Sequence, residues 1–349
     1  MSLRLIARAA SFLVALLAGD CAHSADRLRV GDLPCLCGGA FLAARDQGYF
    51  QKLGLEIEST RFEDGASVLS AIAAGELDIT MIPLQASMFN AVATGAPLAI
   101  ILDAGSNRRG FGATVINIAQ VLYEEGLRSV SDFTQLKGRK FAVPALGGIH
   151  HYNAALALRK VNFNPATDVQ WIANASQPQI VHMLAENEVA AADLAYEFGF
   201  IGQSDRSGPI IVTDDQLVPG AAVSAFAVRR DVLAKRHDAV VRFAMAYLRA
   251  SKDFNAAARD PTAHPEIIDI LARGFPPRTP DLLRETAPNW SYMAEDGLPQ
   301  VGSIMDMQEF WGGKYFTLVQ HKASRQQLFD LTVAKDAKTR LDKEKPFGK

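Results

Sequence analysis

Four short segments of the chain carry the residues best suited to binding a small polar ligand. Each follows a predicted strand and leads into a predicted helix, where the first backbone N–H groups lack partners and the helix dipole attracts negative charge. Two segments are rich in glycine, so an anion or a polar head group is the expected ligand. The predicted ligand-binding residues are Leu36, Cys37, Gln85, Gly148, Ile149, His150, His151, Tyr196 and Glu197.

His150 and His151 are neighbours at the predicted start of a helix. Adjacent helical side chains point about 100° apart, so at most one of the two needs to face the ligand. The helix N-terminus lowers the pKa of a histidine, and a bound anion would favour its protonation. The alternative for either histidine is a surface or capping role.

Tyr196 offers a flat apolar wall with a hydroxyl group, and Glu197 brings a carboxylate beside it. Glu197 either binds a cationic or hydrogen-bond-donating group of the ligand, or pairs with a protein group such as a histidine. Gln85 either contacts the ligand or caps the helix that follows it.

Cys35 and Cys37 are the two cysteines that would remain after removal of a signal peptide. With one residue between them, a disulfide is expected to be strained, so free thiols are predicted. Three roles remain open for them: filling space at a tight turn, lining the ligand site, or reacting as thiols.

The sequence lacks the motifs His-Glu-x-x-His, Gly-x-Ser-x-Gly and Cys-x-x-Cys. Gly312-Gly313-Lys314 has neither the earlier glycine nor the following serine or threonine of a phosphate-binding loop. We therefore predict a protein that is not an enzyme, with no catalytic residues, no metal and no cofactor.

Composition excludes other classes. The 349 residues contain 36 lysines and arginines against 38 acidic residues, a formal net charge of -2. No basic excess is available to neutralise phosphates, so no nucleic acid partner is expected. The chain is 49% hydrophobic, which excludes disorder. Because single cores stop growing at about 250–300 residues, two lobes are expected.

Residues 1–24 are predicted to be a secretory signal peptide. Arg4 and Arg8 form its positive start, and residues 9–18 are an apolar run too short to span a bilayer. Cleavage is expected after Ser24. Lipid anchoring is not expected, because an aspartate precedes the cysteine of this segment. The mature protein is expected to be soluble and exported.

The rest of the chain alternates predicted strands and helices, as in βαβ units with a mostly parallel sheet. An internal similarity recurs about 110 residues apart and predicts two lobes built to one plan. We assign residues 26–113 to lobe 1, 114–222 to lobe 2, and 223–349 to a return to lobe 1 with C-terminal helices. Two connections cross between the lobes, so we expect a hinge that closes them on a ligand.

Several segments, in order and spacing, resemble the nitrate/taurine/alkanesulfonate family of periplasmic substrate-binding proteins of ABC importers. These segments include Gly48-Tyr49-Phe50, Leu53-Gly54-Leu55-Glu56, Ala74-Gly75-Glu76-Leu77-Asp78 and Leu136-Lys137-Gly138-Arg139. The resemblance implies an α/β fold of the type II periplasmic binding protein kind. It also implies a periplasmic location, a small-molecule ligand and ABC permease subunits in the inner membrane as partners. We expect a monomer.

The resemblance also suggests a ligand class. Family members take up small anions such as sulfonates, carboxylates, nitrate and bicarbonate, and in some branches thiamine-pyrimidine precursors. The family's Trp-Glu-Pro corner is Tyr196-Glu197-Phe198 here, and its small or hydroxyl-rich first loop is Cys35-Leu36-Cys37. We therefore expect a larger, partly apolar or aromatic carboxylate or sulfonate, between Tyr196, Leu36 and the His150 loop.

Two other functions would use the same ligand site between the lobes. One is an enzyme similar to the thiamine-pyrimidine synthases, which use a histidine with a cysteine-rich iron motif. The other is a ligand-sensing subunit for a membrane receptor. The predicted signal peptide and the lack of a dense cysteine cluster favour the binding protein over the enzyme, but the sequence does not separate transport from sensing.

Overall fold

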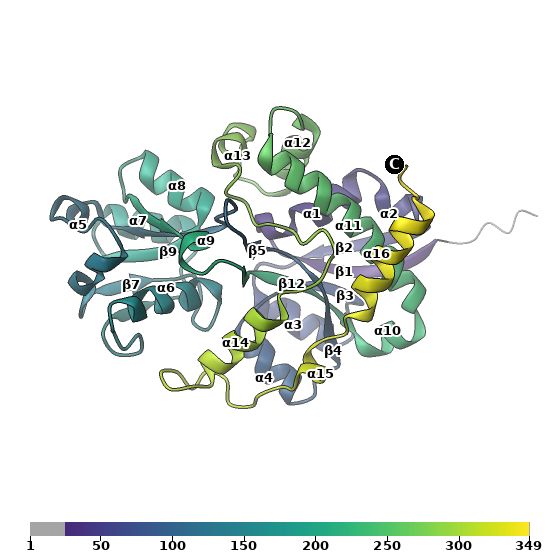
Figure 1. The fold of residues 1–349 in the computed structure, drawn as a ribbon, viewed down its shortest axis with the longest axis horizontal. Helices are drawn as coiled ribbons and strands as arrows, with labels where there is room; N and C mark the ends of the chain where they lie inside the picture. The colour runs from purple at the N-terminus through teal and green to yellow at the C-terminus, as the bar shows by residue number, and fades with distance from the viewer. Residues whose placement is uncertain (1–24, 349) are drawn as a thin grey trace, which may run out of the picture.

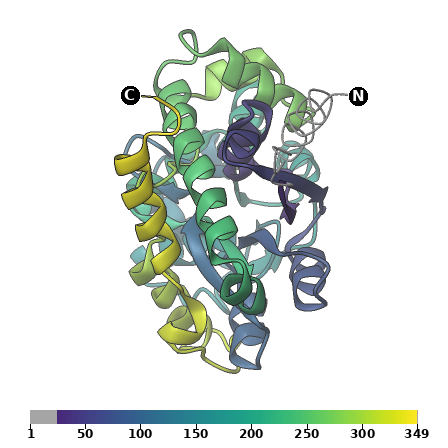
Figure 2. The ribbon, with the colours of Figure 1, turned by 90° about the vertical axis from the view of Figure 1, so that its right-hand side faces the viewer.

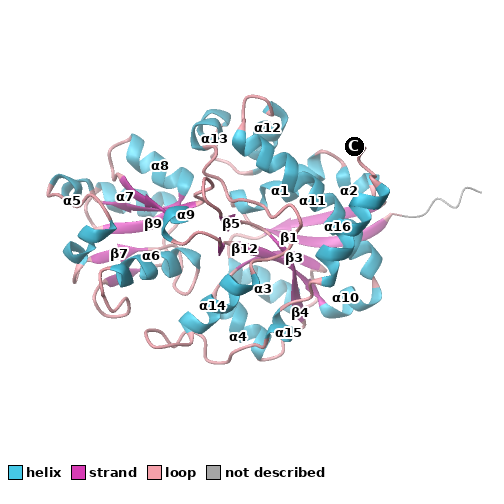
Figure 3. Ribbon diagram, viewed as in Figure 1, coloured by secondary structure: helices cyan, strands magenta, loops and turns pink. Residues whose placement is uncertain are grey.

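The computed structural model of the protein describes residues 25–348 and consists of two α/β lobes. Each lobe has a central sheet covered by helices (Figures 1 and 3). The predicted signal peptide, residues 1–24, lies outside the described residues. Within residues 25–348, no helix combines the length and apolar character needed to cross a membrane.

Lobe 1 is built on a five-stranded sheet of order β2-β1-β3-β12-β4. Its strands are β1 (Asp26–Asp32), β2 (Leu55–Arg61), β3 (Ile79–Pro83), β4 (Leu98–Asp103) and β12 (Ser224–Arg229). β1 pairs in parallel with β2 and β3, whereas β12 runs antiparallel to β3 and β4. The last strand in the sequence, β12, thus lies between two strands from the first third of the chain.

Side chains of successive strand residues face opposite sides of this sheet, and each side is covered by its own helices. The lobe 1 helices are α1 (Gly39–Asp46), α2 (Tyr49–Lys52), α3 (Gly65–Ala73), α4 (Ala86–Ala93), α10 (Arg230–Lys235), α11 (His237–Arg259), α12 (Pro265–Gly274), α13 (Pro280–Thr286), α14 (Val301–Trp311), α15 (Arg325–Leu328) and α16 (Thr332–Glu344). Phe226 and Val228 of β12 belong to the cluster with α1 and α11, whereas Ala225 and Ala227 face the cluster with α3, α4 and α14. α11 and α16 lie side by side on the outer face (Figure 2).

Lobe 2 has a five-stranded sheet of order β10-β6-β9-β7-β8. Its strands are β6 (Thr114–Ile118), β7 (Lys140–Ala142), β8 (Gln170–Ile172), β9 (Ala191–Ala195) and β10 (Ile210–Thr213). Its α-helices are α5 (Gln120–Glu124), α6 (Ile149–Lys160), α7 (Gln177–Ala185), α8 (Tyr196–Ser204) and α9 (Asp214–Leu217). Short 3-10 helices η1 (Leu36–Gly38) and η2 (Val130–Leu136) complete the two lobes.

The two connections between the lobes pair with each other. β5 (Ser106–Asn107) leads from lobe 1 into lobe 2, and β11 (Ala221–Ala222) returns antiparallel to it. The chain crosses this ribbon once more, where Tyr292 and Ser106 exchange backbone hydrogen bonds of 3.0 and 3.1 Å. This two-stranded ribbon joins the lobes at the place where we expect the hinge.

Candidate functional site

The predicted site segments begin four helices, two from each lobe. Cys35–Gly38 leads through η1 into α1, and Gln85 precedes α4; in lobe 2, Gly148 precedes α6 and Ala195 precedes α8. Two of these starts meet directly, because the Ala86 N–H donates to the Gly147 carbonyl across the lobes at 3.0 Å. Gly147 has a φ of 76°, and a Cβ there would lie 2.9 Å from the Cβ of Ala86. Only glycine permits this approach.

The prediction of free thiols is wrong. Cys35 and Cys37 form a disulfide. The chain turns from an extended conformation at Cys35 into the 3-10 helix η1, and the turn brings the two Cα atoms to 5.2 Å, within the usual range for a disulfide. The pair is therefore not available as thiols in this structure. Cys37 is buried, and its Cβ lies near Gly105 at the start of the hinge.

His150 points into lobe 2 and binds a buried aspartate. Its Nδ1 lies 2.7 Å from Oδ1 of Asp193, which follows on β9 and has no exposed surface. Burial lowers the pKa of His150 to about 4, so its imidazole is neutral at pH 7. Of its side chain, 16% remains exposed. His150 is thus the histidine of the pair that retains a face for a ligand.

His151 is enclosed by aromatic rings from both lobes. Its ring centroid lies 4.3 Å from Trp171 in lobe 2, and 4.6 and 4.9 Å from Trp311 and Phe316 in the C-terminal part of lobe 1. Its Nδ1 accepts the Gly147 N–H at 3.0 Å. Only 1% of His151 is exposed, and burial lowers its pKa to about 3. The structure therefore gives His151 a packing role and leaves no free face for a ligand.

We predict that His151→Leu lowers the free energy of unfolding by about 2 kcal/mol, because leucine keeps much of the volume but leaves the Gly147 N–H without an acceptor. Urea unfolding followed by tryptophan fluorescence measures the loss. His151→Asn supplies an acceptor at the position of Nδ1 and should be less stable only through lost ring packing. His182→Leu, at an exposed histidine of α7, is the control and should change stability little. A His151→Leu variant as stable as the wild type would contradict the assigned role.

Glu197 pairs with Arg278, a residue of the returning segment of lobe 1. Nε and Nη2 of Arg278 donate to one oxygen of Glu197 at 2.9 and 2.6 Å. The two side chains are only 5% and 4% exposed. Of the two alternatives for Glu197, the structure shows a protein partner, and the partner is an arginine instead of a histidine.

The Glu197–Arg278 pair is the centre of a longer contact between the lobes. The Arg278 guanidinium lies 5.3 Å from the ring of Phe198 in lobe 2 and 5.7 Å from the ring of Phe275 in lobe 1. Arg61, which is paired with Asp32 at 3.0 Å, lies 5.3 Å from the same Phe275 ring. Two cations and two rings thus alternate from one lobe to the other, and a cation over the face of an aromatic ring is a favourable contact.

The other predicted residues differ in their surroundings. Gln85 donates to the Ser87 hydroxyl at 2.8 Å and makes no capping hydrogen bond to the described backbone of α4. Leu36 is buried in the lobe 1 core, whereas Ile149 is buried in the cluster of α4 and α14, across the lobe boundary. Tyr196 is half-buried and stacks on Phe200 with ring centroids 6.4 Å apart. At Gly148 a Cβ would make only an ordinary contact, 3.6 Å from the carbonyl oxygen of Ala145.

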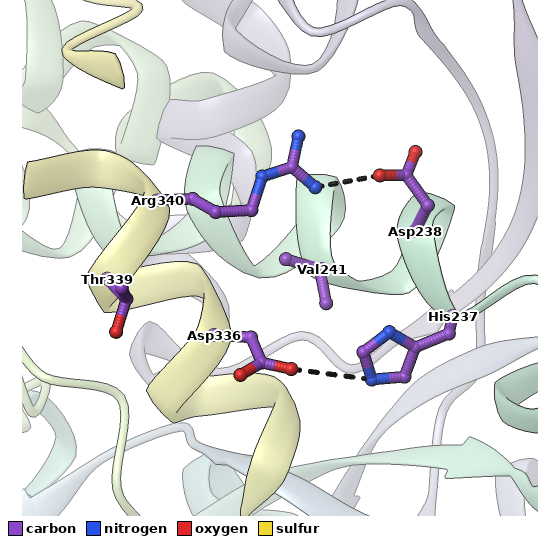
Figure 4. A pocket seen from close by; sticks show the side chains of 6 residues that line it. All are labelled: His237, Asp238, Val241, Asp336, Thr339 and Arg340. Carbon is purple, nitrogen blue, oxygen red and sulfur yellow. Dashed lines mark hydrogen bonds and ion pairs between the residues drawn. The ribbon is translucent and has the colours of Figure 1, made fainter. Parts of the chain in front are cut away.

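A surface hollow of about 230 Å³ on lobe 1 lies far from these segments. It is lined by the start of α11 and by α16 (Figure 4). His237 and Asp336 approach to 3.7 Å across it, and Arg340 binds Asp238 at 2.7 Å. Its charges are already paired. Among residues 25–348, no three His, Cys, Asp or Glu side chains are arranged to hold a metal ion.

Comparison with known proteins identifies the family. The model of the NMT1-like family matches residues 22–272. The chain belongs to the NMT1-like family. A relative of this NMT1-like protein, named as a binding protein of Brucella abortus, is 29% identical over 250 residues, 70% of each chain. The taurine-binding periplasmic protein of Escherichia coli is 24% identical over 237 residues, 67% of this chain and 68% of its own.

Solved structures show the fold of this NMT1-like protein. The periplasmic nitrate-binding protein NrtA from Synechocystis PCC 6803 superposes with a TM-score of 0.73, at 14% identity over 90% of this chain and 89% of its own. The alkanesulfonate-binding protein SsuA from Xanthomonas axonopodis pv. citri gives 0.60, at 17% identity over 84% and 96%. The fold is that of the periplasmic binding proteins, as the sequence resemblance implied.

Proposed function

We propose that the protein is the solute-binding component of an ABC importer, exported to the periplasm, where it captures a small organic anion between its lobes. The observation that carries the proposal is the placement of the four site segments, two in each lobe of a hinged pair. A monomer that closes on its ligand would then deliver it to permease subunits in the inner membrane. The partly apolar carboxylate or sulfonate expected from Tyr196 and Leu36 remains the proposed ligand class.

The N-terminal turn of α6 supports an anionic ligand. α6 has 12 residues and begins after Gly148, which has no side chain that could cap it. As in any α-helix, the first N–H groups of α6 have no acceptor within the helix. The helix dipole adds positive potential at the same place, where His150 keeps its exposed edge. The positive potential is local, since the whole chain carries a net charge of -2.

Native mass spectrometry of protein purified from its own periplasm tests the function, followed by a thermal-shift screen of organic acids. We expect a bound small molecule, and stabilisation by at least one acid. The proposal fails if no small molecule binds and the protein instead turns over a substrate.

Gly148→Asp tests the anion more sharply. A Cβ is tolerated at this helix start, and an aspartate there caps the helix, but its charge repels an anionic ligand. Binding of the ligand recovered by mass spectrometry should weaken more than tenfold. Gly148→Asn is the matched control, because asparagine has the same shape and capping ability without the charge. Equal binding by the two variants would rule out an anion at this position.

A further inference from the structure

A chain of hydrogen bonds leads from His150 into the interior of lobe 2. His150 Nδ1 meets Asp193 Oδ1 at 2.7 Å. Asp193 contacts Asp214 of α9, and Asp214 Oδ2 in turn accepts from the Thr114 hydroxyl at 2.6 Å and from Asn153 Nδ2 at 2.7 Å. Except for His150, every member of this chain is 0–2% exposed. The sequence did not predict this chain of hydrogen bonds. Its function depends on which of its groups carry a proton.

The two aspartates share one proton. Oδ2 of Asp193 and Oδ1 of Asp214 are buried and have no hydrogen-bond donor among residues 25–348, so they are the oxygens left for the contact between the two carboxyl groups. Two ionised carboxylates in contact and shielded from water would repel, so one of them is protonated. Asp214 is the anion, because its other oxygen already accepts two hydrogen bonds. Asp193 holds the proton, and burial beside Asp214 raises the pKa of Asp193 well above its ordinary value.

The protonated Asp193 determines the tautomer of His150. Its Oδ2–H donates to Asp214, so its Oδ1 is left as an acceptor for the Nδ1–H of His150. The imidazole is neutral, because burial lowers its pKa. A neutral imidazole with a proton on Nδ1 has a lone pair on Nε2. Nδ1 faces the fully buried Asp193, so the exposed part of the ring is the opposite edge, which carries Nε2.

We propose that His150 Nε2 accepts a hydrogen bond from the ligand, so that the ligand is an organic acid with an N–H or O–H donor beside its acidic group. This inference rests on the proposed function and specifies its ligand. The helix start at Gly148 binds the acidic group of the ligand, and His150 Nε2 accepts a hydrogen bond from the donor beside that group. An acid that places a lone pair against Nε2 leaves two acceptors facing each other and binds roughly tenfold or more weakly.

The tautomer can be measured without a ligand. The ¹⁵N spectrum of histidine-labelled protein at pH 7, assigned with His150→Gln, should show a protonated Nδ1 and an unprotonated Nε2 for His150. A proton on Nε2, or an imidazolium, overturns the proposal. Either result leaves the proposed solute-binding function standing, because that function is tested by the ligand screen.

Two isosteric variants separate positioning from simple structural support. Asp193→Asn reproduces the protonated aspartate, since its Oδ1 accepts from His150 and its Nδ2 donates to Asp214; tautomer and stability should be unchanged. Asp214→Asn donates to Asp193, lets Asp193 ionise and should convert His150 to an imidazolium. If Asp193→Asn changes the His150 spectrum and Asp214→Asn does not, the assignment of the proton is wrong.

A matched pair of probes tests the ligand class. Pyrrole-2-carboxylate and furan-2-carboxylate have similar shape and charge, but the first has an N–H donor where the second has an ether oxygen. Pyrrole-2-carboxylate should raise the melting temperature more at equal millimolar concentration. The preference should disappear in Asp214→Asn, where His150 has a proton on each nitrogen. A shift as large or larger with the furan acid overturns the proposal.

Discussion

Replacing Arg278 by alanine is expected to open the lobes and to weaken ligand binding by about 100-fold. Arg278 and Glu197 lie on opposite lobes and are almost fully buried in their contact. Without Arg278, the closed form would hold the Glu197 carboxylate away from water with no cation beside it. Removing one partner of a buried ion pair costs about 3–5 kcal/mol.

We expect the free-energy cost of the unpaired carboxylate to fall mainly on the closed form, because hinge motion would separate the positions of Glu197 and Arg278. Inside a rigid core, an unpaired carboxylate destabilises the whole fold. Between hinged lobes, opening returns Glu197 to water, so the loss falls mainly on the closed form. Ligand binding draws on the closed population, and affinity falls by the factor by which that population falls. The melting temperature of the ligand-free variant should therefore change less than its affinity.

Spin labels at exposed positions, Lys52→Cys in lobe 1 and Glu125→Cys in lobe 2, report the distance between the lobes. We expect a narrow distribution for the wild type and a broader, longer one for Arg278→Ala. Arg284→Ala is the matched control, because Arg284 forms a 2.8 Å pair with Asp281 at side-chain exposures of 39% and 88%. Such surface pairs contribute at most about 1 kcal/mol. Identical distributions for Arg278→Ala and Arg284→Ala would show that the buried pair does not hold the lobes together.

The sequence contains the information for the fold in its local patterns. Strand-helix alternation depends on neighbouring residues, and the repeat of about 110 residues is a recurrence of such local patterns; both indicate two α/β lobes. The helix starts were identified for the same reason, since glycine and proline act on the backbone where they stand. At that level, sequence and structure agree.

The contacts across the lobes could not be found in this way. Arg278 and Glu197 are 81 residues apart, and no local signal marks either as the partner of the other. Asp193 offered a weak signal, as a lone aspartate in the apolar strand Ala191–Ala195, because a carboxyl in such a strand is expected to have a buried partner. The prediction of free thiols at Cys35 and Cys37 failed because no local signal marks the turn into η1, which brings the two Cα atoms to 5.2 Å.

Asp103 provides the second large effect, a dependence of stability on pH. It ends β4 just before the hinge, and its Oδ2 accepts the N–H of Gly105 at 3.1 Å and that of Ala294 at 2.9 Å. These two hydrogen bonds connect Ala294, in the segment that returns to lobe 1, with Gly105 at the start of the hinge. Oδ1 is buried and has no donor within residues 25–348. Burial raises the pKa of Asp103 to about 7.

The direction of this pH dependence follows from which state, folded or unfolded, binds the Asp103 proton more tightly. The folded protein holds the Asp103 proton up to about pH 7, whereas the unfolded chain releases it near pH 4. The folded state therefore binds more protons between these values, and stability falls as pH rises through this range. The stability that the protonated Asp103 contributes is fully present below about pH 4 and is lost above about pH 7. At about 1.4 kcal/mol per pKa unit, the change is on the order of 4 kcal/mol.

Asp103→Asn isolates this contribution. Asparagine has the shape of the protonated aspartate, keeps an oxygen for both N–H donors and does not ionise. The buried histidines, whose pKa values are lowered, add an opposite slope in both proteins, so it cancels in the difference. Urea unfolding at pH 4 and pH 8 should show near-equal stability at pH 4 and an asparagine variant more stable by several kcal/mol at pH 8. Asp281→Asn, at a side chain that is 88% exposed, is the control and should change stability little. A constant difference for Asp103→Asn would mean that the carboxyl ionises as readily in the folded protein as in the unfolded chain, and would contradict the prediction.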